Sequence, residues 1–312
     1  MAATIDRASA APISPVHTPV LLDEVIALLA PPPGGRVIDA TVNGGGHARA
    51  LLETIGPDGR LLGLDRDPAV LAELQRAAAE EIRVGRLRLV ATSFVRIAEV
   101  AVTEGFGRAD AILFDLGLSS FHLEASGRGF SFEREEPLDL RFDPDDAGMP
   151  SAAELLRRIP TDDLARIIHD YGEERHARRI ARHIGRVRGR HPFRTAADLR
   201  DCILDALPGP ARRHGRRSVA RVFQALRIVV NAELDAIERA LPQVPRLLRP
   251  GGRVAVISFH SLEDRIAKTF FRAAAGAGEM IVVTRKPLRP GAAELARNPR
   301  AGSARLRVAA RA

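Results

Sequence analysis

Four apolar segments that alternate with helical patterns are the feature that most constrains the fold of this chain. The predicted strands cover residues 36–40, 61–65, 86–93 and 109–115, and helix-compatible segments separate them at 48–55, 68–81 and 94–105. A further helix is predicted at 17–30, ended by three prolines. Strands that alternate with helices are typical of a parallel sheet covered by helices on both faces. We therefore predict an α/β fold.

The alternation stops between residues 127 and 217, where helical patterns repeat and no buried strand pattern is present. Ser151 and Glu154 have capping-box spacing, and apolar residues recur at helical intervals between 161 and 184. Strand patterns then resume. The elements predicted after the helical segment are one long amphipathic helix at 219–241, a strand at 253–259, a helix at 262–274 and a strand pair around 280–286 and 304–310.

These patterns predict an α/β domain that is interrupted by a helical insertion. We assign residues 1–16 to a mobile N-terminal extension, residues 17–126 and 218–312 to the α/β domain, and residues 127–217 to the inserted helical domain. The N-terminal segment lacks the apolar core of a signal peptide, and no apolar run approaches the roughly 18 residues of a membrane helix. We therefore expect a cytoplasmic protein without a membrane span.

The basic charge of the chain favours a polyanionic partner. The net charge is +8 and the pI is near 10.9, values that are typical of proteins that contact nucleic acid. Lysine occurs only at Lys268 and Lys286, so a general preference for arginine is an alternative explanation. Arginine and histidine nevertheless concentrate in residues 174–191 and 211–221. This clustering predicts that the insertion contacts nucleic acid or a nucleoprotein.

Three predicted strands end in an aspartate, at Asp39, Asp65 and Asp115. In an open parallel sheet, ligands bind beyond the carboxyl ends of the strands, which is where these side chains are expected. Asp39 is followed by a loop with three consecutive glycines at 44–46. Asp65 comes about 20 residues after that loop, the spacing at which an acid accepts hydrogen bonds from a ribose. The alternative is that Asp65 caps the next helix.

The glycine loop narrows the choice of an adenosine-containing ligand. It has no glycine followed by Lys and Ser or Thr, so it does not fit a nucleoside triphosphate. His47 and Ala48 follow the glycines, a departure from G-x-G-x-x-G that makes NAD the second choice. S-adenosylmethionine has no pyrophosphate and needs only close backbone approach and acids near the ribose. We therefore expect S-adenosylmethionine as the cofactor.

Residues 115–120, DLGLSS, carry the sharpest chemical signal. A carboxylate that ends the fourth strand, held by a turn at Gly117, can accept a hydrogen bond from an exocyclic amine and aim its nitrogen at a methyl donor. The alternative is a loop of capping residues. His260 could line the same pocket, and Ser261 could cap the next helix with Asp264 at its N3 position; we expect both.

Two other kinds of site are not expected. The histidines are scattered and Cys202 is the only cysteine, so the sequence predicts no metal. No G-x-S-x-G motif precedes Ser258 or Ser261, so a hydrolase triad is not predicted. Cys202 lies in the amphipathic run 196–207 and is expected to be a half-buried apolar residue.

The order of motifs along the chain resembles the bacterial RsmH (also called MraW) family, methyltransferases that methylate the N4 amine of a cytidine in 16S ribosomal RNA. The matching segments begin at His17 and are HTPVLLDEV, IDATVNGGGH, LDRDP, DLGLSS, RGFSF, PLDLRFD, YGEER, FQALRIVVN, PGGRVAVISFHSLEDR and ARNPRAGSARLR. The family fold is a Rossmann-like S-adenosylmethionine-dependent methyltransferase sheet that is interrupted by an inserted helical domain. This agrees with the break in the alternation described above.

The resemblance implies roles for individual residues. The residues implied to bind S-adenosylmethionine are Gly45, Gly46, His47, Asp65, Phe94, Asp115 and His122. Among them, Asp65 would contact the ribose and Phe94 the adenine. Asp115 would lie where the donor meets the target base and would be the catalytic residue. His122 stands where the family usually has Gln, and an imidazole could still supply the polar contact.

The resemblance also implies the partner, which is 16S rRNA or the 30S ribosomal subunit, and a role for the insertion in RNA recognition. The expected reaction is direct transfer: the cytosine leaves its stack, its amine donates a hydrogen bond to Asp115, and the nitrogen attacks the methyl group. From the residues, two other functions remain alternatives. These are a nicotinamide-dependent oxidoreductase and a non-enzymatic RNA-binding protein.

Overall fold

A computed structural model describes residues 19–146 and 148–312, so the predicted extension at 1–16 lies outside the described residues. The sheet has seven strands in the order β3-β2-β1-β4-β5-β7-β6. Strand β7 is antiparallel to both of its neighbours, and the other pairs are parallel. The strands are β1 (Arg36–Asp39), β2 (Arg60–Asp65), β3 (Leu87–Ala91), β4 (Ala109–Asp115), β5 (Leu248–Ser258), β6 (Met280–Val282) and β7 (Arg305–Arg311).

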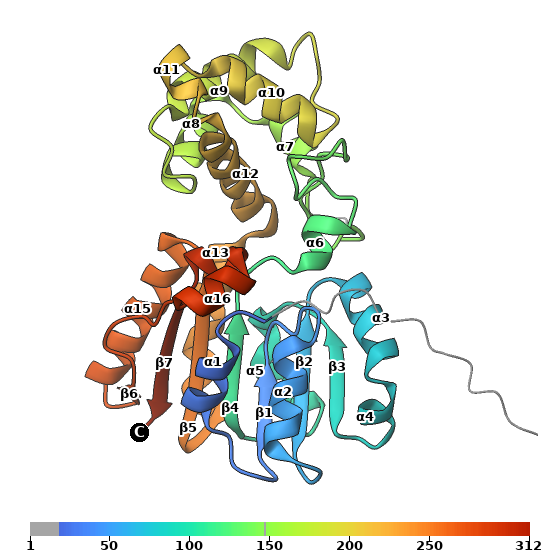
Figure 1. Ribbon diagram of the computed structural model, residues 1–312, viewed down its shortest axis with the longest axis vertical. Helices are drawn as coiled ribbons and strands as arrows, with labels where there is room; N and C mark the ends of the chain where they lie inside the picture. Colours follow the sequence, from blue (N-terminus) through green and yellow to red (C-terminus); the bar gives the residue numbers. More distant parts are fainter. Residues whose placement is uncertain (1–18, 147) are drawn as a thin grey trace, which may run out of the picture.

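Helices flank the sheet and also form a second body beyond the carboxyl ends of its parallel strands (Figure 1). The helices that belong to the sheet are α1 (Leu22–Leu29), α2 (Gly46–Ile55), α3 (Pro68–Ala77), α4 (Ala79–Arg83), η1 (Phe94–Arg96), α5 (Ile97–Thr103), α13 (Glu233–Ala240), η2 (Leu241–Gln243), α14 (Val244–Leu247), α15 (Ser261–Gly276), α16 (Ala292–Arg297) and η3 (Pro299–Ser303). Helix α6 (Ser120–Glu124) lies at the junction. The second body contains α7 (Ala152–Arg158), α8 (Thr161–Asp170), α9 (Ala177–Val187), α10 (Ala196–Ala206), α11 (Gly209–Arg212) and α12 (Gly215–Asn231).

Neighbouring residues of each strand face opposite helical layers. Ile38 and Leu62 pack in a cluster with residues of α5, α13 and α15, whereas Val37 and Leu61 pack in a cluster with residues of α1, α2 and α3. All four side chains are fully buried, and burial of each contributes about 1.5–3 kcal/mol. The predicted α/β fold with helices on both faces is therefore confirmed. Within the described residues, no helix is both long and apolar enough to span a membrane.

The strand order creates a topological switch point between β1 and β4. From β1 the chain moves outward through β2 to β3, and it then returns to place β4 on the other side of β1. The loops that leave β1 and β4 therefore part in opposite directions and open a crevice between them. Asp39 and Asp115 end these two strands. The fold thus brings both aspartates to the place where open α/β sheets bind ligands.

The second body has a hydrophobic core of its own. That cluster contains buried residues of α7, α8, α9 and α10 together with Phe130, Leu138 and Leu140 from the chain that enters the insertion. It also contains Val222 and Leu226 of α12. Because the inner face of α12 packs here, we propose that the insertion extends from residue 127 through Asn231.

The single long helix predicted at 219–241 is wrong, because the chain forms two helices there. Ala232 has left-handed backbone angles, φ 49 and ψ 41, and separates α12 from α13. The Asn231 side chain stabilises the break: its Oδ1 accepts from the Phe142 backbone N–H at 2.9 Å, and its Nδ2 donates to the Leu140 carbonyl at 2.7 Å. Tertiary hydrogen bonds therefore override a continuous helical pattern.

The turn after β2 connects the sheet to the insertion. Asp67 Oδ1 caps α3 by accepting from the Ala69 N–H at 3.0 Å. Asp67 Oδ2 accepts a hydrogen bond from the Arg128 guanidinium and lies 3.1 Å from Nε2 of His122. Arg66 donates to the Asn231 carbonyl at 2.8 Å. The two ends of the insertion are thus both held by one turn.

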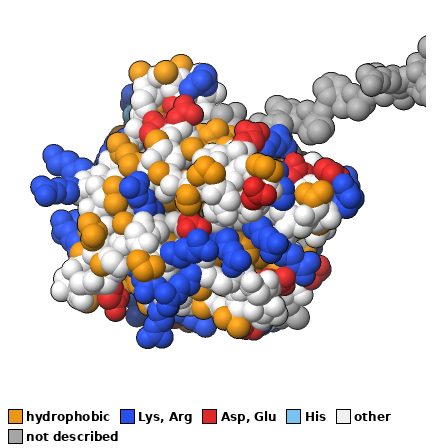
Figure 2. Space-filling model, turned by 90° about the horizontal axis from the view of Figure 1, so that it is seen from below, with side chains coloured by type: hydrophobic (Ala, Val, Ile, Leu, Met, Phe, Trp, Pro, Cys, Tyr) orange, Lys and Arg blue, Asp and Glu red, His pale blue; other side chains and the backbone are white. Residues whose placement is uncertain are grey.

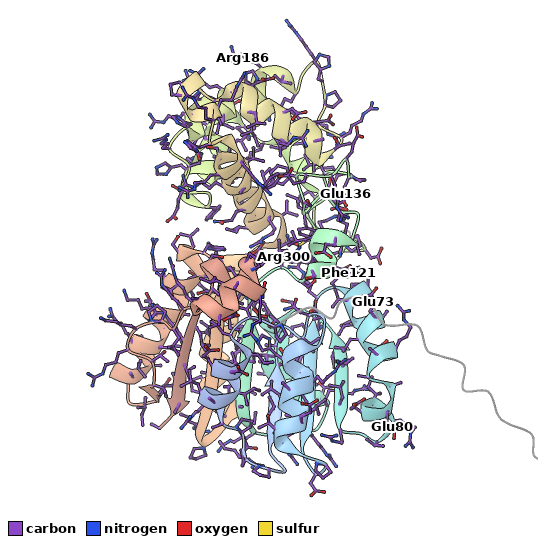
Figure 3. The ribbon with its side chains drawn as sticks, viewed as in Figure 1. Glu73, Glu80, Phe121, Glu136, Arg186 and Arg300 are labelled. Carbon is purple, nitrogen blue, oxygen red and sulfur yellow. The ribbon has the colours of Figure 1, made fainter. Side chains whose placement is uncertain are left out.

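The C-terminal segment adds another contact at this junction. Arg300 of η3 donates to Ser120 Oγ at 2.9 Å and to Glu124 Oε1 at 2.5 Å, so it reaches both ends of α6. Figure 3 places Arg300 and Phe121 between the sheet and the second body. Helix α6 is therefore fixed from the tail as well as from Asp67.

Basic side chains are not confined to the insertion. Figure 2 shows Lys and Arg side chains gathered on the face at the opposite, amino-terminal end of the parallel strands. Several arginines at this end already bind protein groups. Arg36 donates to the Phe106 carbonyl at 2.5 Å, Arg86 to the Gly56 carbonyl at 2.8 Å, and Arg249 pairs with Asp110 at 3.1 Å. Some of the arginines at this end therefore stabilise the fold.

Ile203→Ala is expected to loosen the insertion more than the sheet. Ile203 of α10 is fully buried in the insertion core, and its truncation should cost about 2–5 kcal/mol, against about 0.5–1.5 kcal/mol for Ile203→Val. Hydrogen exchange should accelerate in α8, α9 and α10 while the amides of β1, β2 and β4 stay protected. Equal acceleration in both bodies would show that they unfold as one unit.

Candidate functional site

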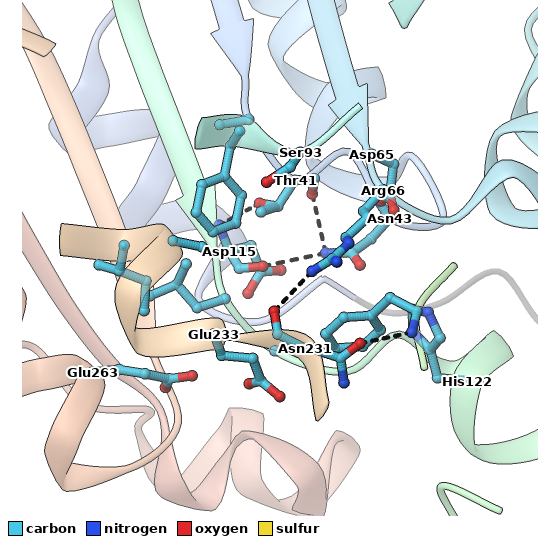
Figure 4. A pocket seen from close by; sticks show the side chains of 17 residues that line it. Thr41, Asn43, Asp65, Arg66, Ser93, Asp115, His122, Asn231, Glu233 and Glu263 are labelled. Carbon is cyan, nitrogen blue, oxygen red and sulfur yellow. Dashed lines mark hydrogen bonds between the residues drawn. The ribbon is translucent and has the colours of Figure 1, made fainter. Parts of the chain in front are cut away.

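A pocket lies at the carboxyl ends of β1, β2 and β4, at the switch point described above (Figure 4). The sheet side of its wall includes Thr41, Asn43, Asp65, Phe94 and Asp115. Arg66 comes from the turn after β2. The opposite side comes from α6, α13 and the insertion, with the side chains His122, Phe142, Asn231 and Glu233. The pocket therefore has one wall from the sheet domain and one from the insertion and its junction.

The loop after β1 is held to the neighbouring strands by hydrogen bonds. The Asn43 N–H donates to Asp65 Oδ2 at 2.9 Å, and its Nδ2 donates to the Thr41 carbonyl at 3.0 Å and the Asp115 carbonyl at 3.3 Å. Thr41 Oγ1 accepts from the Asp115 N–H at 2.6 Å. These bonds fix the ends of β1, β2 and β4 relative to each other.

Gly45 occupies a position that requires glycine. Its φ is +78°, and a Cβ there would lie 2.4 Å from Leu74 Cδ1, so a side chain would bring both backbone strain and a clash. Gly45 directly precedes α2, which begins at Gly46. Gly45, Gly46 and His47 are adjacent to the pocket but are not among its wall residues. Their role in donor binding stays a prediction.

Asp65 is buried and held by backbone groups. In addition to the Asn43 N–H on Oδ2, its Oδ1 accepts from the Asp67 N–H at 2.9 Å. Burial raises the pKa of Asp65, and these two N–H groups partly oppose the shift. The carboxylate keeps further lone pairs at the pocket wall. The cap of α3 is Asp67, not Asp65, so the alternative capping role of Asp65 is wrong.

Asp115 combines burial with an oxygen that has no hydrogen-bond partner. Its side chain is 5% exposed, its Oδ2 lies 3.5 Å from His47 Nδ1, and its Oδ1 is unpartnered among the described residues. A buried acceptor without a donor costs free energy that a ligand can recover. Asp115 Oδ1 is therefore a ready acceptor for a donor group that enters the pocket.

Asp39 lies next to Asp115 and His47 but is not one of the residues of the pocket wall. Its Oδ1 accepts from the Thr41 N–H at 3.2 Å, and its Oδ2 has no hydrogen-bond partner in the described part of the chain. Burial raises the pKa of Asp39 to about 7, although the nearby His47 lowers it. Burial alone would lower the pKa of His47, but Asp115 and Asp39 outweigh that effect and raise it.

His122 is positioned by protein groups on both ring nitrogens. Nδ1 accepts from the Ser119 N–H at 3.1 Å within a capping box that begins α6, and Nε2 lies 3.1 Å from Asp67 Oδ2. The ring also contacts Phe130 and Phe142, with centroids 5.2 and 5.1 Å away. His122 lines the pocket, but its hydrogen bonds are already used. Its predicted polar contact to the donor stays a prediction.

Phe94 lies in η1 just beyond β3 and forms an apolar part of the wall. Its ring meets that of Phe114 edge to face, with centroids 5.7 Å apart. Ser93 caps η1 by accepting from the Val95 N–H at 3.3 Å. The fold therefore presents an aromatic ring in the same pocket wall as Asp65, as a purine site would need.

The SFHSLED segment forms a cap that differs from the predicted one. His260, not Ser261, is the N-cap of α15, and the N3 residue is Glu263, not Asp264. Glu263 Oε2 accepts from the N–H groups of Phe259 at 2.7 Å and His260 at 3.2 Å. A carboxylate one methylene longer than Asp264 reaches back to these groups, which explains the difference.

Within the described residues, one group of side chains has the spacing of a metal site: Glu233, His260 and Glu263. Glu233, however, already binds Arg227 through two hydrogen bonds of 2.8 Å. Glu263 is engaged by the cap of α15, as described above. A cation would have to displace the half-buried Arg227, so this group is explained by protein contacts.

The wall residues that sequence reasoning missed include Asn43, Arg66, Asn231 and Glu233. Asn43 directly precedes the glycines, and Asn231 follows the apolar run LRIVV. Asn231 could have been identified as a candidate because it is a polar residue at the end of an apolar run. Arg66 and Glu233 carried none, because charged residues beside a helix end are usually solvated.

Comparisons with known proteins identify related sequences. Residues 14–312 match the family model described as the MraW methylase family. Ribosomal RNA small subunit methyltransferase H of Magnetococcus marinus is 48% identical over 311 residues, which cover 94% of this chain and 97% of the relative. The protein of the same name from Acidothermus cellulolyticus is 45% identical over 325 residues, with 98% and 97% coverage. Among solved structures, TrmN from Thermus thermophilus has a TM-score of 0.43 at 13% identity and covers 94% of this chain and 48% of that chain.

Asp39→Asn is expected to stabilise the protein at neutral and alkaline pH. Because the pKa of Asp39 is raised to about 7, the folded protein keeps a proton that the unfolded chain releases above about pH 4, and the free energy of unfolding falls across this range. The Asn side chain of the variant does not titrate, so its free energy of unfolding does not fall in this way. The advantage of the variant should grow between about pH 4 and 7 and then level off on the order of 4 kcal/mol.

Urea denaturation at several pH values measures this difference. The exposed Asp58→Asn variant is the control and should show no pH-dependent gain. A gain for Asp39→Asn that is constant between pH 5 and 8 would contradict the explanation from burial.

Proposed function

The chain belongs to the MraW methylase family, and we propose that it transfers a methyl group from S-adenosylmethionine to the N4 amine of a cytidine in 16S rRNA of the small ribosomal subunit. The names of the relatives support small-subunit rRNA as the substrate. One structural observation carries the chemical part of the proposal. It is the buried, unpartnered Oδ1 of Asp115 in the wall of the switch-point pocket.

S-adenosylmethionine is the methyl donor of this family, and when bound it supplies an electrophilic methyl group on a sulfonium. The pocket residues fit this molecule. Asp65 offers carboxylate lone pairs for ribose hydroxyls, and Phe94 offers an aromatic face for adenine. Gly45, Gly46 and His47 are the proposed loop contacts, since the left-handed Gly45 keeps the backbone free of a side chain.

Asp115 would act on the target amine. A cytosine N4 amine is a poor nucleophile because its lone pair is delocalised into the ring. A hydrogen bond to Asp115 Oδ1 orients the amine, and the same oxygen accepts its proton as the new nitrogen–carbon bond forms. Because the site is buried, the cytosine has to leave its stack to reach it.

Methylation at cytosine C5 requires a cysteine nucleophile, which this pocket lacks in its wall. Cys202 is the only cysteine of the sequence. It lies in α10 within the insertion core, where burial raises the pKa of its thiol to about 12. A buried thiol of this kind is inert, which supports the amine as the target.

The insertion is the proposed RNA-binding part. On α9, Ile180 and Ile184 are buried, whereas the arginines at 178, 182 and 186 are exposed. Among the described residues, these three arginines form no ion pair, unlike Arg212 with Asp205 and Arg216 with Glu133. Figure 3 places Arg186 at the far end of the insertion. Unpaired guanidinium groups along one helix face suit a phosphate backbone.

Asp115→Ala and Asp115→Asn are both expected to lower kcat by about 10²–10⁴-fold, because neither side chain can accept the proton. The assay measures transfer of labelled methyl from S-adenosylmethionine to small subunits from a strain that lacks the activity. Asp58→Asn, at the opposite end of the sheet, should transfer at the parent rate. Absence of label from 16S rRNA with the parent protein would refute the proposed function. Parent-rate transfer by Asp115→Ala would refute only the role of Asp115.

Thermal unfolding separates the proposed enzyme from an oxidoreductase. S-adenosylhomocysteine should raise the Tm, because it binds the folded state, and NAD should leave it unchanged. The reverse result would favour the nicotinamide-dependent alternative. Binding of 16S rRNA without any transfer would favour a non-enzymatic RNA-binding protein.

The triple variant Arg178→Ala, Arg182→Ala and Arg186→Ala is expected to weaken RNA binding and to reduce its salt dependence. Each lost phosphate contact should lower the slope of log K against log salt by about 0.7–0.9. S-adenosylhomocysteine binding should not change. The matched control replaces Arg83, Arg96 and Arg239 with Ala, since these exposed arginines pair with acids within their own helices or turns. Equal salt slopes for the two triples would mean that the α9 arginines are only solvated.

A further inference from the structure

We propose that His47 is a positioning residue that holds one proton against Asp115 and so keeps that carboxylate ionised for the target amine. The proposal rests on the proposed methyl transfer, and it assigns to the His47 side chain a role beyond contact with the donor. It starts from the geometry of the two ring nitrogens. Nε2 faces a backbone carbonyl oxygen, which can only accept a hydrogen bond, and Nδ1 faces a carboxyl oxygen of Asp115.

The first nitrogen fixes one proton. His47 Nε2 lies 3.0 Å from the carbonyl oxygen of Val20, and both residues are buried. A carbonyl oxygen has no proton to give. Nε2 must therefore carry a hydrogen in any state that keeps this bond, and the neutral ring is restricted to the Nε2–H tautomer.

The second nitrogen then needs a proton of its own. In the Nε2–H tautomer, Nδ1 presents a lone pair, and it faces Asp115 Oδ2 at 3.5 Å. A lone pair opposite an ionised carboxylate is repulsive, so the contact is favourable only when a proton lies between the two atoms. An imidazolium on His47 supplies that proton and leaves Asp115 ionised.

The surroundings favour the imidazolium. The carboxylates near His47 are Asp115 at the end of β4 and Asp39 at the end of β1, and Asp65 at the end of β2 lies near Asp39. Among the described residues, no arginine or lysine forms an ion pair with any of these three aspartates. His47 is thus the basic group that lies beside Asp115 and Asp39, whereas His122 lies nearer to Asp65. The raised pKa of His47 is consistent with that arrangement.

The arrangement divides the two oxygens of Asp115 between two tasks. Oδ2 faces His47, and Oδ1 has no partner and is left for the amine. During transfer the amine nitrogen bonds to the methyl carbon while the methyl–sulfur bond breaks and its electron pair stays on sulfur as a neutral thioether. The N–H bond of the amine breaks and the proton moves to Oδ1. His47 takes no proton in this step because both of its nitrogens already carry one. Its charge keeps Asp115 ionised beforehand.

Two near-isosteric variants separate the two ring nitrogens. The side-chain amide of Asn can place its nitrogen near the position of Nδ1, so His47→Asn keeps a donor toward Asp115. The longer Gln places its amide near Nε2, so His47→Gln keeps the bond to the Val20 carbonyl and leaves Asp115 Oδ2 unpaired. Asp58→Asn is the control, because Asp58 is exposed at the opposite end of the sheet.

The rates of methyl transfer and their pH dependence form the first test. His47→Gln should lower kcat by about 10²-fold, the usual effect of removing one preorganised donor, and His47→Asn should recover at least ten-fold of that loss. The KM for S-adenosylmethionine should stay within two-fold of the parent. The acidic limb of the kcat profile should move to higher pH in His47→Gln, because its carboxylate has lost a cationic neighbour. Asp58→Asn should match the parent.

A measurement on the parent protein keeps the proposal testable if the variants do not fold. In ¹⁵N-histidine spectra, the His47 signal should remain that of an imidazolium above about pH 6.5, the ordinary histidine value. On deprotonation it should become the Nε2–H tautomer. A neutral His47 ring at pH 6.5 would overturn the proposal.

The kinetic results also have an outcome that contradicts the proposal. Weaker S-adenosylhomocysteine binding with an unchanged kcat in His47→Gln would make His47 a donor-binding residue only. Failure of the proposed function is distinguishable from either result. In that case the parent itself transfers no methyl group to 16S rRNA, whatever the state of the His47 ring.

Discussion

Burial of three aspartates at neighbouring strand ends is the constraint on which the rest of the site depends. A buried carboxylate costs several kcal/mol unless hydrogen-bond donors or a cation balance it. The protein balances the three differently: Asp65 by two backbone N–H groups, Asp115 by His47, and Asp39 by a pKa raised to about 7. Asp39 and Asp115 each keep an unpartnered oxygen, but only Asp115 lines the pocket. The same burial that costs stability therefore leaves one acceptor for a ligand.

The β2–α3 turn links this acidic cluster to the inserted helices. Asp65 accepts a hydrogen bond from the loop that contains the glycines. Two residues later, Asp67 binds His122 and Arg128 from the chain that enters the insertion. Arg66, between them, binds the carbonyl of Asn231 where the chain leaves it. A shift of the insertion would therefore act on the turn that holds Asp65. This provides a physical connection between the proposed RNA contact on the helices and the pocket below them.

The sequence predicted those features that depend on local patterns. Apolar strands ending in Asp39, Asp65 and Asp115 follow from periodicity and from the rule for parallel sheets, and the structure has them at the switch point. Features that depend on contacts between residues far apart in the sequence could not be predicted from it. The break at Ala232 depends on bonds from Asn231 to residues about 90 positions away, and the engagement of His122 depends on Asp67. The cap of α15 depended on whether Glu263 or Asp264 reaches the free N–H groups, which composition does not decide.

The central claim is that Asp115 accepts the proton of an exocyclic amine, so the methylated atom is the most direct test. The purified protein would methylate small subunits with a deuterium-labelled donor, and the 16S rRNA would be digested to nucleosides. Chromatography and mass spectrometry against N4-methylcytidine and 5-methylcytidine standards then identify the product. We predict that the label is found in N4-methylcytidine. Label in 5-methylcytidine, or in a nucleoside other than cytidine, would contradict the account.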